Sequence, residues 1–487
     1  MKLLRLVRDI LSNEERSEAL RLLLLMFIGM LFEMLGVGLV IPLVSILTQG
    51  PSIANTPISS YGLSWLDGLS RLDVVFCALA FLVAAYLFKN LFLVFLMWKQ
   101  SKFAYGVQES LSKRLFFTYL SQPYSFHLDN NSSNLIRNVT TETNLFSSHA
   151  LMQGLQLIAE GMVVLGIFFL LLLLEPVGTL VAVLLLGSAA TLFFRSTRSR
   201  VLTWGGQRQM HEGLRLQQLQ QGLGAVKDVI ISGKESAFLA QYDKHNHATA
   251  LAARRQEFLK QLPRLCLEWL AISGLVILIG SMVLQGRELA EVVPVFGAFA
   301  AAAFRLMPSI NRILGAVQSL RYMQPVIDTL HRQVFLPTVR DNEVLGRLTF
   351  ENEIRIVGVF FSYATSAGPA LEDISLRVGK GQMIGFVGPS GSGKSTLIDV
   401  LLGLLEPQSG KVLVDGKDIR EHLRAWRRLI GYVPQTIYLT DDTLRRNVAF
   451  GVPDDQIDDV AVETSIKAAQ LNDFVSRLPE GLGVKVG

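Results

Sequence analysis

The residues with the clearest chemistry lie in the run GPSGSGKST at positions 388–396. The run fits the pattern G-x-x-x-x-G-K-[ST], in which glycines allow the backbone to point several N–H groups at phosphate oxygens. A helix that begins at Lys394 would add its positive N-terminal end, and the lysine would reach the β- and γ-phosphates. We therefore predict a nucleoside triphosphate site formed by Gly388, Pro389, Ser390, Gly391, Ser392, Gly393, Lys394, Ser395 and Thr396.

Further residues are candidates for roles around this site. The hydroxyl of Ser395 is expected to complete the coordination of Mg²⁺. Tyr363 could stack on adenine, although a strand tyrosine taken alone more often packs in a core. Gln435 could reach Mg²⁺ or an attacking water, and the alternative is a solvated turn residue that follows a proline. A helix is expected to start near Thr443, with Asp442 or Thr443 as its cap.

The elements that would position these residues lie in the last third of the chain. From about Phe350, short β-like runs alternate with helical stretches such as STLIDVLLGLL, which indicates a soluble α/β domain. The β-like runs are EIRIVGVFFSY, ALEDISLRV, QMIGFVG, KVLVDG and LIGYVPQ. We expect residues 383–387 to form the strand that leads into the glycine-rich run.

The rest of the chain has the composition of a membrane protein. Of the 487 residues, 50% are hydrophobic and 18% are charged, against about 25% charged residues in an average soluble domain. This composition excludes a disordered or coiled-coil protein and argues against a purely soluble enzyme. The net charge of +5 is mild and argues against a nucleic-acid partner. Cys77 and Cys266 lie in apolar runs and cannot form a disulfide framework or a zinc site.

Six apolar segments are long enough to cross a bilayer, namely residues 22–47, 74–98, 151–174, 177–194, 265–284 and 292–314. The long segments 99–144 and 195–264 carry many Lys and Arg, whereas the other connections are short or poor in basic residues. By the positive-inside rule, both ends of the chain and these two segments lie in the cytoplasm. We predict an α-helical membrane domain at 1–335, a linker at 336–348 and the first part of an α/β domain at 349–487.

In their order along the chain, these features resemble ABC transporters of the exporter type. Tyr363, the run at 388–396, YVPQ and DDTLRRNVAFG follow one another as in the nucleotide-binding domain of that family, and six spans precede them. The resemblance implies a P-loop α/β fold, ATP and Mg²⁺ as cofactors, and ATP hydrolysis with Lys394 and Gln435 as catalytic residues. It also implies a dimer, of two copies of this chain or with a related half-transporter, whose domains enclose ATP between them.

One departure from the family concerns the end of the sequence. It stops at Gly487, whereas the family's signature motif, Walker B aspartate, catalytic glutamate and switch histidine come later. We expect that the sequence is truncated, because half of a sheet domain would leave strands unpaired. The alternative is a membrane-anchored ATP-binding protein that is naturally short and does not transport.

Charged residues within the spans bear on the cargo, because they are costly there. Lys89, Arg264 and Arg305 could bind a polyanionic head group such as a pyrophosphate. The stretches FEMLGVGLVIPLVSIL, PRLCLEWLAISG, FRLMPSINRI and GAVKDVIISGKE resemble the flippases of lipid-linked oligosaccharides, whose cavity cations engage a pyrophosphate at the positions of these three residues. Lys89 departs from the arginine that the resemblance implies, and a lysine makes no bidentate phosphate contact.

Other readings of the cargo and of these charges stay open. Arg264 is spaced to pair with Glu268 on one helix face, and Glu33 and Glu160 could join the cations in a structural network. An exporter of another lipid, a drug or a peptide is the other reading of the cargo. We expect a bacterial inner membrane protein with its nucleotide-binding domain in the cytoplasm, coupled to the spans through residues 122–127 and 225–234.

Overall fold

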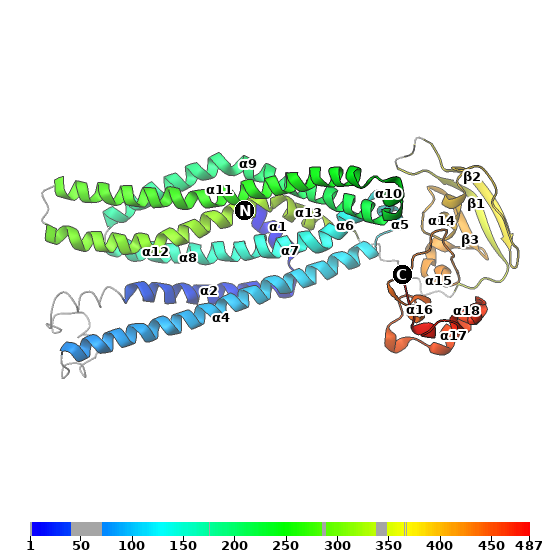
Figure 1. Cartoon of the computed structure of the whole chain (residues 1–487), viewed down its shortest axis with the longest axis horizontal. Coiled ribbons are helices and arrows are strands. Elements are labelled where there is room, and N and C mark those ends of the chain that lie inside the picture. Colours follow the sequence, from blue (N-terminus) through cyan, green and yellow to red (C-terminus); the bar gives the residue numbers. More distant parts are fainter. Residues whose placement is uncertain are drawn as a thin grey trace. The chain divides into compact units, whose positions relative to one another are not determined.

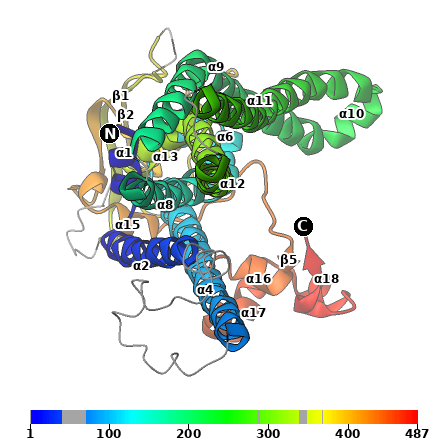
Figure 2. The ribbon, with the colours of Figure 1, turned by 90° about the vertical axis from the view of Figure 1, so that its left-hand side faces the viewer.

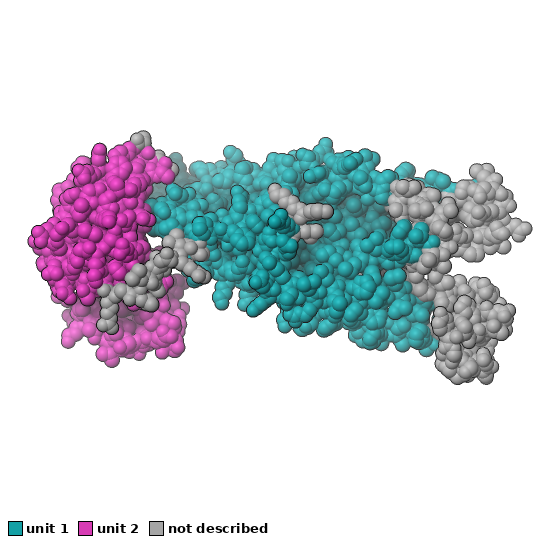
Figure 3. Space-filling model, turned by 180° about the vertical axis from the view of Figure 1, so that it is seen from behind, with its two compact units in different colours: residues 1–340 teal, residues 341–487 magenta. Residues whose placement is uncertain are grey.

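The computed structural model describes residues 2–39, 71–174, 176–284, 289–337, 348–364, 366 and 368–487. The chain divides into two compact units, Met1–Arg340 and Asp341–Gly487 (Figure 3). Most of the predicted linker at 336–348 and part of the first predicted span, residues 40–47, lie outside the described residues.

Unit 1 is helical (Figure 1). Its elements are α1 (Lys2–Ile10), α2 (Asn13–Gly38), α4 (Arg71–Leu120), α5 (Tyr124–Asp129), α6 (Ser132–Arg137), η4 (Asn138–Glu142), α7 (Thr143–Leu145), η5 (Phe146–Leu151), α8 (Met152–Leu174), α9 (Pro176–Gly224), α10 (Val226–Ser232), α11 (Glu235–Leu284), α12 (Leu289–Tyr322) and α13 (Gln324–Val334). The segments η4 and η5 are π-helices, in which each turn holds one more residue than in an α-helix.

Each predicted span falls in a different long helix, as far as the spans are described. Three stretches of the described residues are long and apolar enough to cross a membrane, Asn13–Gly36, Leu79–Leu120 and Ser132–Phe169. The helix α4 has 50 residues and is therefore about 75 Å long, more than twice the roughly 30 Å of a bilayer's hydrocarbon core. The basic segments between the spans are thus continuations of the spanning helices.

Two of these continuations, from α9 and α11, run together to the turn that carries α10 (Figure 2). The exposed side chains of Ile230 and Ile231 lie on α10. A separate buried core joins α4, η5 and α13 and includes Leu111, Leu115, Phe146, Ile327 and Leu330. This core holds these ends of the helices together.

Unit 2 contains a four-stranded antiparallel sheet in the order β2-β1-β3-β4. The strands are β1 (Glu353–Phe361), β2 (Leu371–Gly379), β3 (Ser409–Val414) and β4 (Lys417–Asp418). The central strand β1 pairs Ile356 with Leu376 on one side and with Val412 on the other. Helices α14 (Lys394–Leu401) and α15 (Leu423–Arg427) add Leu397, Val400 and Trp426 to the core beside this sheet.

The final part of unit 2 consists of short elements. They are η6 (Ile419–Glu421), which precedes α15, then β5 (Asp442–Thr443), α16 (Leu444–Val448), η7 (Asp454–Gln456), α17 (Asp459–Ala468), α18 (Asn472–Ser476), η8 (Gly481–Gly483) and β6 (Lys485–Val486). The strands β5 and β6 pair with each other in an antiparallel ribbon.

Two of the predicted strands are wrong. Residues 383–387 and the run LIGYVPQ at 429–435 have no strand assignment, and the side chains of Met383 and Val387 are 99% and 98% exposed. A strand is stable only when a neighbour accepts and donates its backbone hydrogen bonds, and β1 to β4 pair among themselves. Runs that are apolar on both faces are typical of interior parallel strands, and the described residues supply no parallel neighbour for either run.

Candidate functional site

The glycine-rich run lies at the N-terminus of α14, as predicted. Gly391 and Gly393 both have φ of 83°, a conformation that costs other residues steric strain. A side chain at Gly393 would also overlap the carbonyl oxygen of Ala370. The glycines are therefore needed for this loop, which leaves the first N–H groups of α14 without partners inside the helix.

The ammonium group of Lys394 turns back over the loop. Its Nζ donates to the carbonyl oxygens of Gly388 at 2.9 Å and Pro389 at 2.8 Å, and to Oγ of Ser392 at 3.3 Å. A full positive charge and the positive end of a helix thus meet in one small loop. This combination fits the phosphates of a nucleotide, because both features favour negative charge at the same place.

Tyr363 is brought to the same helix, although it precedes the loop in the chain. Its hydroxyl is 3.1 Å from Oγ1 of Thr396, and its ring meets the ring of Phe361 edge to face at 5.0 Å. The side chain is half-buried against the core of unit 2. Tyr363 therefore packs against the core, which was the alternative to a role in binding, and its stacking on adenine stays a prediction.

Gln435 lies apart from these contacts. It is exposed, in the irregular segment between α15 and β5, and no hydrogen bond joins it to the loop among the described residues. Its proposed contact with Mg²⁺, shared with Ser395, stays a prediction. The predicted helix start nearby is confirmed, because Oγ1 of Thr443 accepts from the backbone N–H of Arg446 at 3.3 Å and caps α16.

Lys89 carries an ion pair within unit 1. Its Nζ is 3.3 Å from Oε2 of Glu33 and 4.5 Å from the centre of the Tyr86 ring. The Tyr86 hydroxyl in turn donates to the carbonyl oxygen of Gly36 at 2.9 Å. These contacts join α4 to α2. The structure thus contains the ion pair between Lys89 and Glu33 that the sequence analysis gave as the alternative to a cargo site.

Arg264 pairs with Glu268 one turn along α11, at 2.9 Å, and 63% of its side chain is exposed. Glu160 lies 2.6 Å from Arg312, which is not one of the three cations that we considered. The backbone of Arg305 belongs to α12, while its side chain is outside the described part of the structure.

The structure contains a buried charged cluster that the sequence analysis did not predict. Glu142, with a side chain that is 0% exposed, lies 3.2 Å from Arg208 and 3.3 Å from Arg137. Arg137 also donates to the carbonyl oxygen of Gln209 at 3.0 Å. The cluster joins η4 to α9, two elements that are far apart in the chain.

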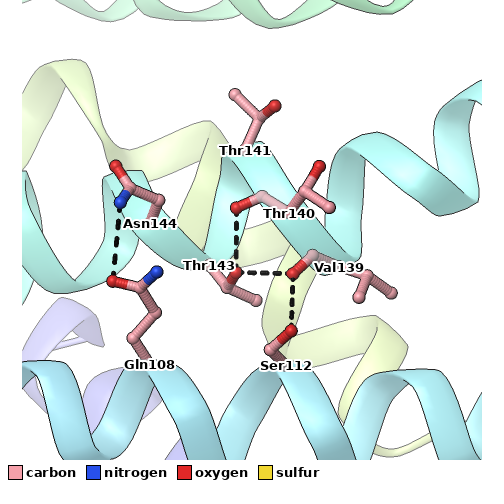
Figure 4. Close-up of a pocket in the computed structure, with 7 residues that line it drawn as sticks. All are labelled: Gln108, Ser112, Val139, Thr140, Thr141, Thr143 and Asn144. Atoms are coloured by element: carbon pink, nitrogen blue, oxygen red, sulfur yellow. Dashed lines mark hydrogen bonds between the residues drawn. The ribbon is translucent and has the colours of Figure 1, made fainter.

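The outer side of η4 and α7 borders a polar hollow of about 550 Å³ against α4 (Figure 4). It is lined by Gln108, Ser112, Val139, Thr140, Thr141, Thr143 and Asn144. Among the described residues, the lining of this hollow carries hydroxyl and amide groups and no charged side chain.

A helical unit with membrane-spanning stretches and a second unit with a phosphate-binding loop define an integral membrane protein that carries a nucleotide-binding domain. Two family models match these same regions, the ABC transporter transmembrane region over residues 19–285 and the ABC transporter domain over residues 371–483. The chain belongs to the ABC transporter family. The family and the fold class predicted from the sequence are thereby confirmed.

Two of the proteins that this chain resembles are lipid flippases. The chain is 27% identical to an ATP-dependent lipid A-core flippase of Cupriavidus metallidurans over 80% of its own length and 65% of that protein. It is 28% identical to an ATP-dependent lipid A-core flippase of Methylococcus capsulatus, over 77% of this chain and 63% of that protein. It therefore spans less than two thirds of the length of these relatives.

A solved structure shows the same fold. The structure of a bacterial Atm1-family ABC exporter with ATP bound matches 98% of this chain and 81% of its own, with a TM-score of 0.79 and 20% sequence identity. Both units of the chain thus have the exporter fold, with the membrane unit and the nucleotide-binding unit fused in one polypeptide.

Proposed function

We propose that this chain is part of an ATP-driven exporter that moves a phosphorylated glycolipid, of the lipid-linked oligosaccharide type, across the membrane. The observation that carries the proposal is the loop at 388–396 on α14, fused to a membrane unit in one chain. The flippase relatives support a lipid as cargo. Lipid A-core is the second candidate cargo, because these relatives are named for it.

The nucleotide-binding residues would act by holding charge and position. The N–H groups at the start of α14 and the ammonium of Lys394 would hold the phosphates of ATP. When ATP binds, Lys394 would donate to phosphate oxygens and no longer to the carbonyl oxygens of Gly388 and Pro389. Ser395 and Gln435 would hold Mg²⁺, which neutralises charge on the phosphates when bound. Tyr363 would present its ring to the base from beside Thr396.

The cargo site would use cations of unit 1. Lys89 is the best placed of the three candidates, because it lies on a predicted span and is mostly buried. A lipid phosphate would take the place of Glu33 beside its ammonium group. Arg264 would do the same at the expense of its pair with Glu268, and Arg305 completes the proposed set.

The working protein would be a dimer in a bacterial inner membrane, with its nucleotide-binding domains in the cytoplasm. Its domains would be those expected from the sequence, 1–335 and 349–487 with a linker at 336–348. ATP hydrolysis would drive alternating access of the spans. A second copy of the chain or a related half-transporter would complete each site.

Transport by the full-length protein in reconstituted vesicles tests this proposal. The probes are a fluorescent lipid-linked oligosaccharide, lipid A and a hydrophobic dye, each assayed with and without ATP. Lys394→Ala should abolish ATP-dependent movement of the cargo. Movement of the dye alone, or movement of lipid that is independent of ATP, would contradict the proposal.

Variants at Lys89 test the cargo site separately. Lys89→Ala should lower oligosaccharide-lipid transport about 10- to 100-fold, the effect of losing one charge-assisted hydrogen bond of roughly 1.5–3 kcal/mol, while ATP binding is unchanged. Lys113→Ala, at an exposed lysine on the same helix, is the matched control. If Lys89→Ala/Glu33→Gln transports normally, Lys89 serves only to balance Glu33 and has no role toward the cargo.

A further inference from the structure

Two lysines lie beside one tryptophan ring at the end of the second predicted span. Nζ of Lys99 is 5.3 Å from the centre of the Trp98 ring, and Nζ of Lys102 is 5.6 Å from it. Nζ of Lys99 is also 5.7 Å from the centre of the Phe95 ring. These residues lie within about two turns of α4 and belong neither to the nucleotide loop nor to the cargo candidates.

The positive charges of the two lysines are not balanced within the chain. No aspartate or glutamate of the described residues forms an ion pair with Lys99 or Lys102, whereas Lys89 on the same helix is paired with Glu33. An aromatic ring attracts ammonium groups through the negative charge of its face, but it neutralises neither of them. The two lysines therefore leave a place at which an anion would be stabilised.

Exposed apolar side chains lead along α4 to these lysines. They follow one another at intervals of three, four or seven residues, so that they form a stripe on one face of the helix. The stripe consists of Phe81, Phe88, Leu91, Phe95 and Trp98. Lys102, four residues after Trp98, continues the same face beyond the predicted span, which ends at residue 98. This face of α4 is thus apolar within the span and positively charged directly after it.

The arrangement has two explanations. Tryptophan and lysine are both common where a span leaves the hydrocarbon core, and there they anchor a helix without selecting one kind of lipid. Alternatively, the two lysines select a lipid by the charge of its headgroup. Two ammonium groups near one ring repel each other unless an anion lies between them. The second explanation also accounts for the whole face of α4, because a phospholipid has apolar chains beside its negatively charged phosphate.

We propose that Lys99, Lys102 and Trp98 form a binding site for the headgroup of an anionic phospholipid, whose acyl chains lie along the apolar stripe of α4. The two ammonium groups hold the phosphodiester, and the exposed indole contributes its N–H as a third donor. A zwitterionic headgroup is bound less tightly, because its own cation is repelled by the lysines. The lipid is a component of the membrane and not the cargo, so that the proposal goes beyond the exporter function and does not depend on it.

The test uses the full-length protein, purified in detergent and freed of bound lipid. Phosphatidylglycerol and phosphatidylcholine with identical acyl chains are titrated, and the lipids retained per chain are counted by native mass spectrometry. We expect one phosphatidylglycerol per chain that binds more tightly than any phosphatidylcholine. Lys99→Gln and Lys102→Gln should each weaken its binding about fivefold, and the double variant about 25-fold, as is typical of removing one or two cations near a lipid surface. Binding of phosphatidylcholine should be unchanged.

Arg195→Gln is the matched control, because Arg195 is an exposed cation directly after another predicted span, at residues 177–194. It should bind phosphatidylglycerol as the wild type does. Lys99→Arg/Lys102→Arg, which keeps both charges, should also retain binding, and the thermal unfolding midpoints show whether each variant is folded. Equal binding of the two lipids by the wild type, or equal loss in Arg195→Gln, would overturn the proposal and leave Trp98 and the two lysines as a general anchor.

Discussion

The two units contain the same arrangement of three charges with opposite signs and opposite exposure. In unit 1, the carboxylate of Glu142 lies between Arg137 and Arg208 and is 0% exposed. In unit 2, the guanidinium of Arg446 lies between Asp442 and Asp454 and is 46% exposed. Water can replace the partners of Arg446 but not those of Glu142. Loss of the central charge should therefore lower the free energy of unfolding much more in unit 1 than in unit 2.

The largest expected effect follows from removing the central charge of the buried cluster. Glu142→Gln removes the carboxylate that two buried guanidinium groups share, and breaking a buried pair in this way costs about 3–5 kcal/mol. Hydrogen exchange should therefore accelerate in η4 and in the facing part of α9. Glu109→Gln, at an exposed glutamate of α4, should leave both regions unchanged.

A triple replacement sharpens the comparison. Arg137→Met/Glu142→Leu/Arg208→Met removes all three charges and keeps similar volumes, so that no charge is left buried without a partner. We expect it to be about as stable as the wild type, since apolar replacement of buried ion networks is often neutral or stabilising. A triple variant as unstable as Glu142→Gln would mean that the loss came from altered packing and not from unpaired charge.

The second effect concerns the space that the cluster occupies. A side chain at Gly213 on α9 would collide with Nη1 of Arg137 and would lie 2.8 Å from Oδ1 of Asn134. Gly213→Ala should cost about 1–3 kcal/mol, as is usual for overpacking. It should be measured by the thermal unfolding midpoint in detergent and by hydrogen exchange of α6 and η4.

Gly206 on the same helix provides the control. A Cβ there meets nothing within 4 Å, and replacing an unstrained helical glycine by alanine gains about 0.5–1 kcal/mol. The two substitutions should therefore shift stability in opposite directions. Equal shifts would show that the collision with Arg137 is relieved by a movement of its side chain.

Features that depend on residues close together in the chain could be predicted from the sequence, whereas the buried cluster around Glu142 could not. The start of α14 directly after the glycines of the loop at 388–396 and the helix cap, predicted at Asp442 or Thr443 and observed at Thr443, depend on neighbours in the chain, and both positions were predicted. Arg137 and Glu142 are five positions apart, which places them about 140° apart around an α-helix, so that pairing is not expected. The π-helix η4 changes this spacing, and Arg208 comes from a different helix.

The wrongly predicted strands have a related cause. Residues 383–387 and 429–435 have strand-like composition, but a strand also needs a neighbouring strand, which no local pattern supplies. For the same reason the contact between His211 of α9 and His245 of α11, whose Nδ1 atoms are 3.0 Å apart, could not be foreseen, because each histidine alone is an ordinary residue of a long helix. Contacts between distant segments depend on the packing of α9 against α11.

The smallest effect is expected at the exposed cluster of unit 2. Hydrogen bonds from Arg446 lower the pKa of Asp454 and of Asp442. A lowered carboxyl pKa stabilises the folded state above the unfolded value of about 3.8, and this stabilisation is lost as the pH falls through the lowered pKa. Arg446→Ala should therefore be slightly less stable than the wild type at pH 7, and the difference should shrink below about pH 3.8 and in high salt.

Hydrogen exchange of β5, α16 and η7 at low and high salt measures this difference, with thermal unfolding at pH 7 and pH 3.5 as the second probe. Arg428→Ala, at another exposed arginine of unit 2, should show neither dependence. A loss as large as that of Glu142→Gln, or one that does not respond to salt, would mean that Arg446 is not screened by water. Exposure would then fail to explain the difference between the two clusters, and the geometry of the paired Arg446–Asp454 contact would have to explain it instead.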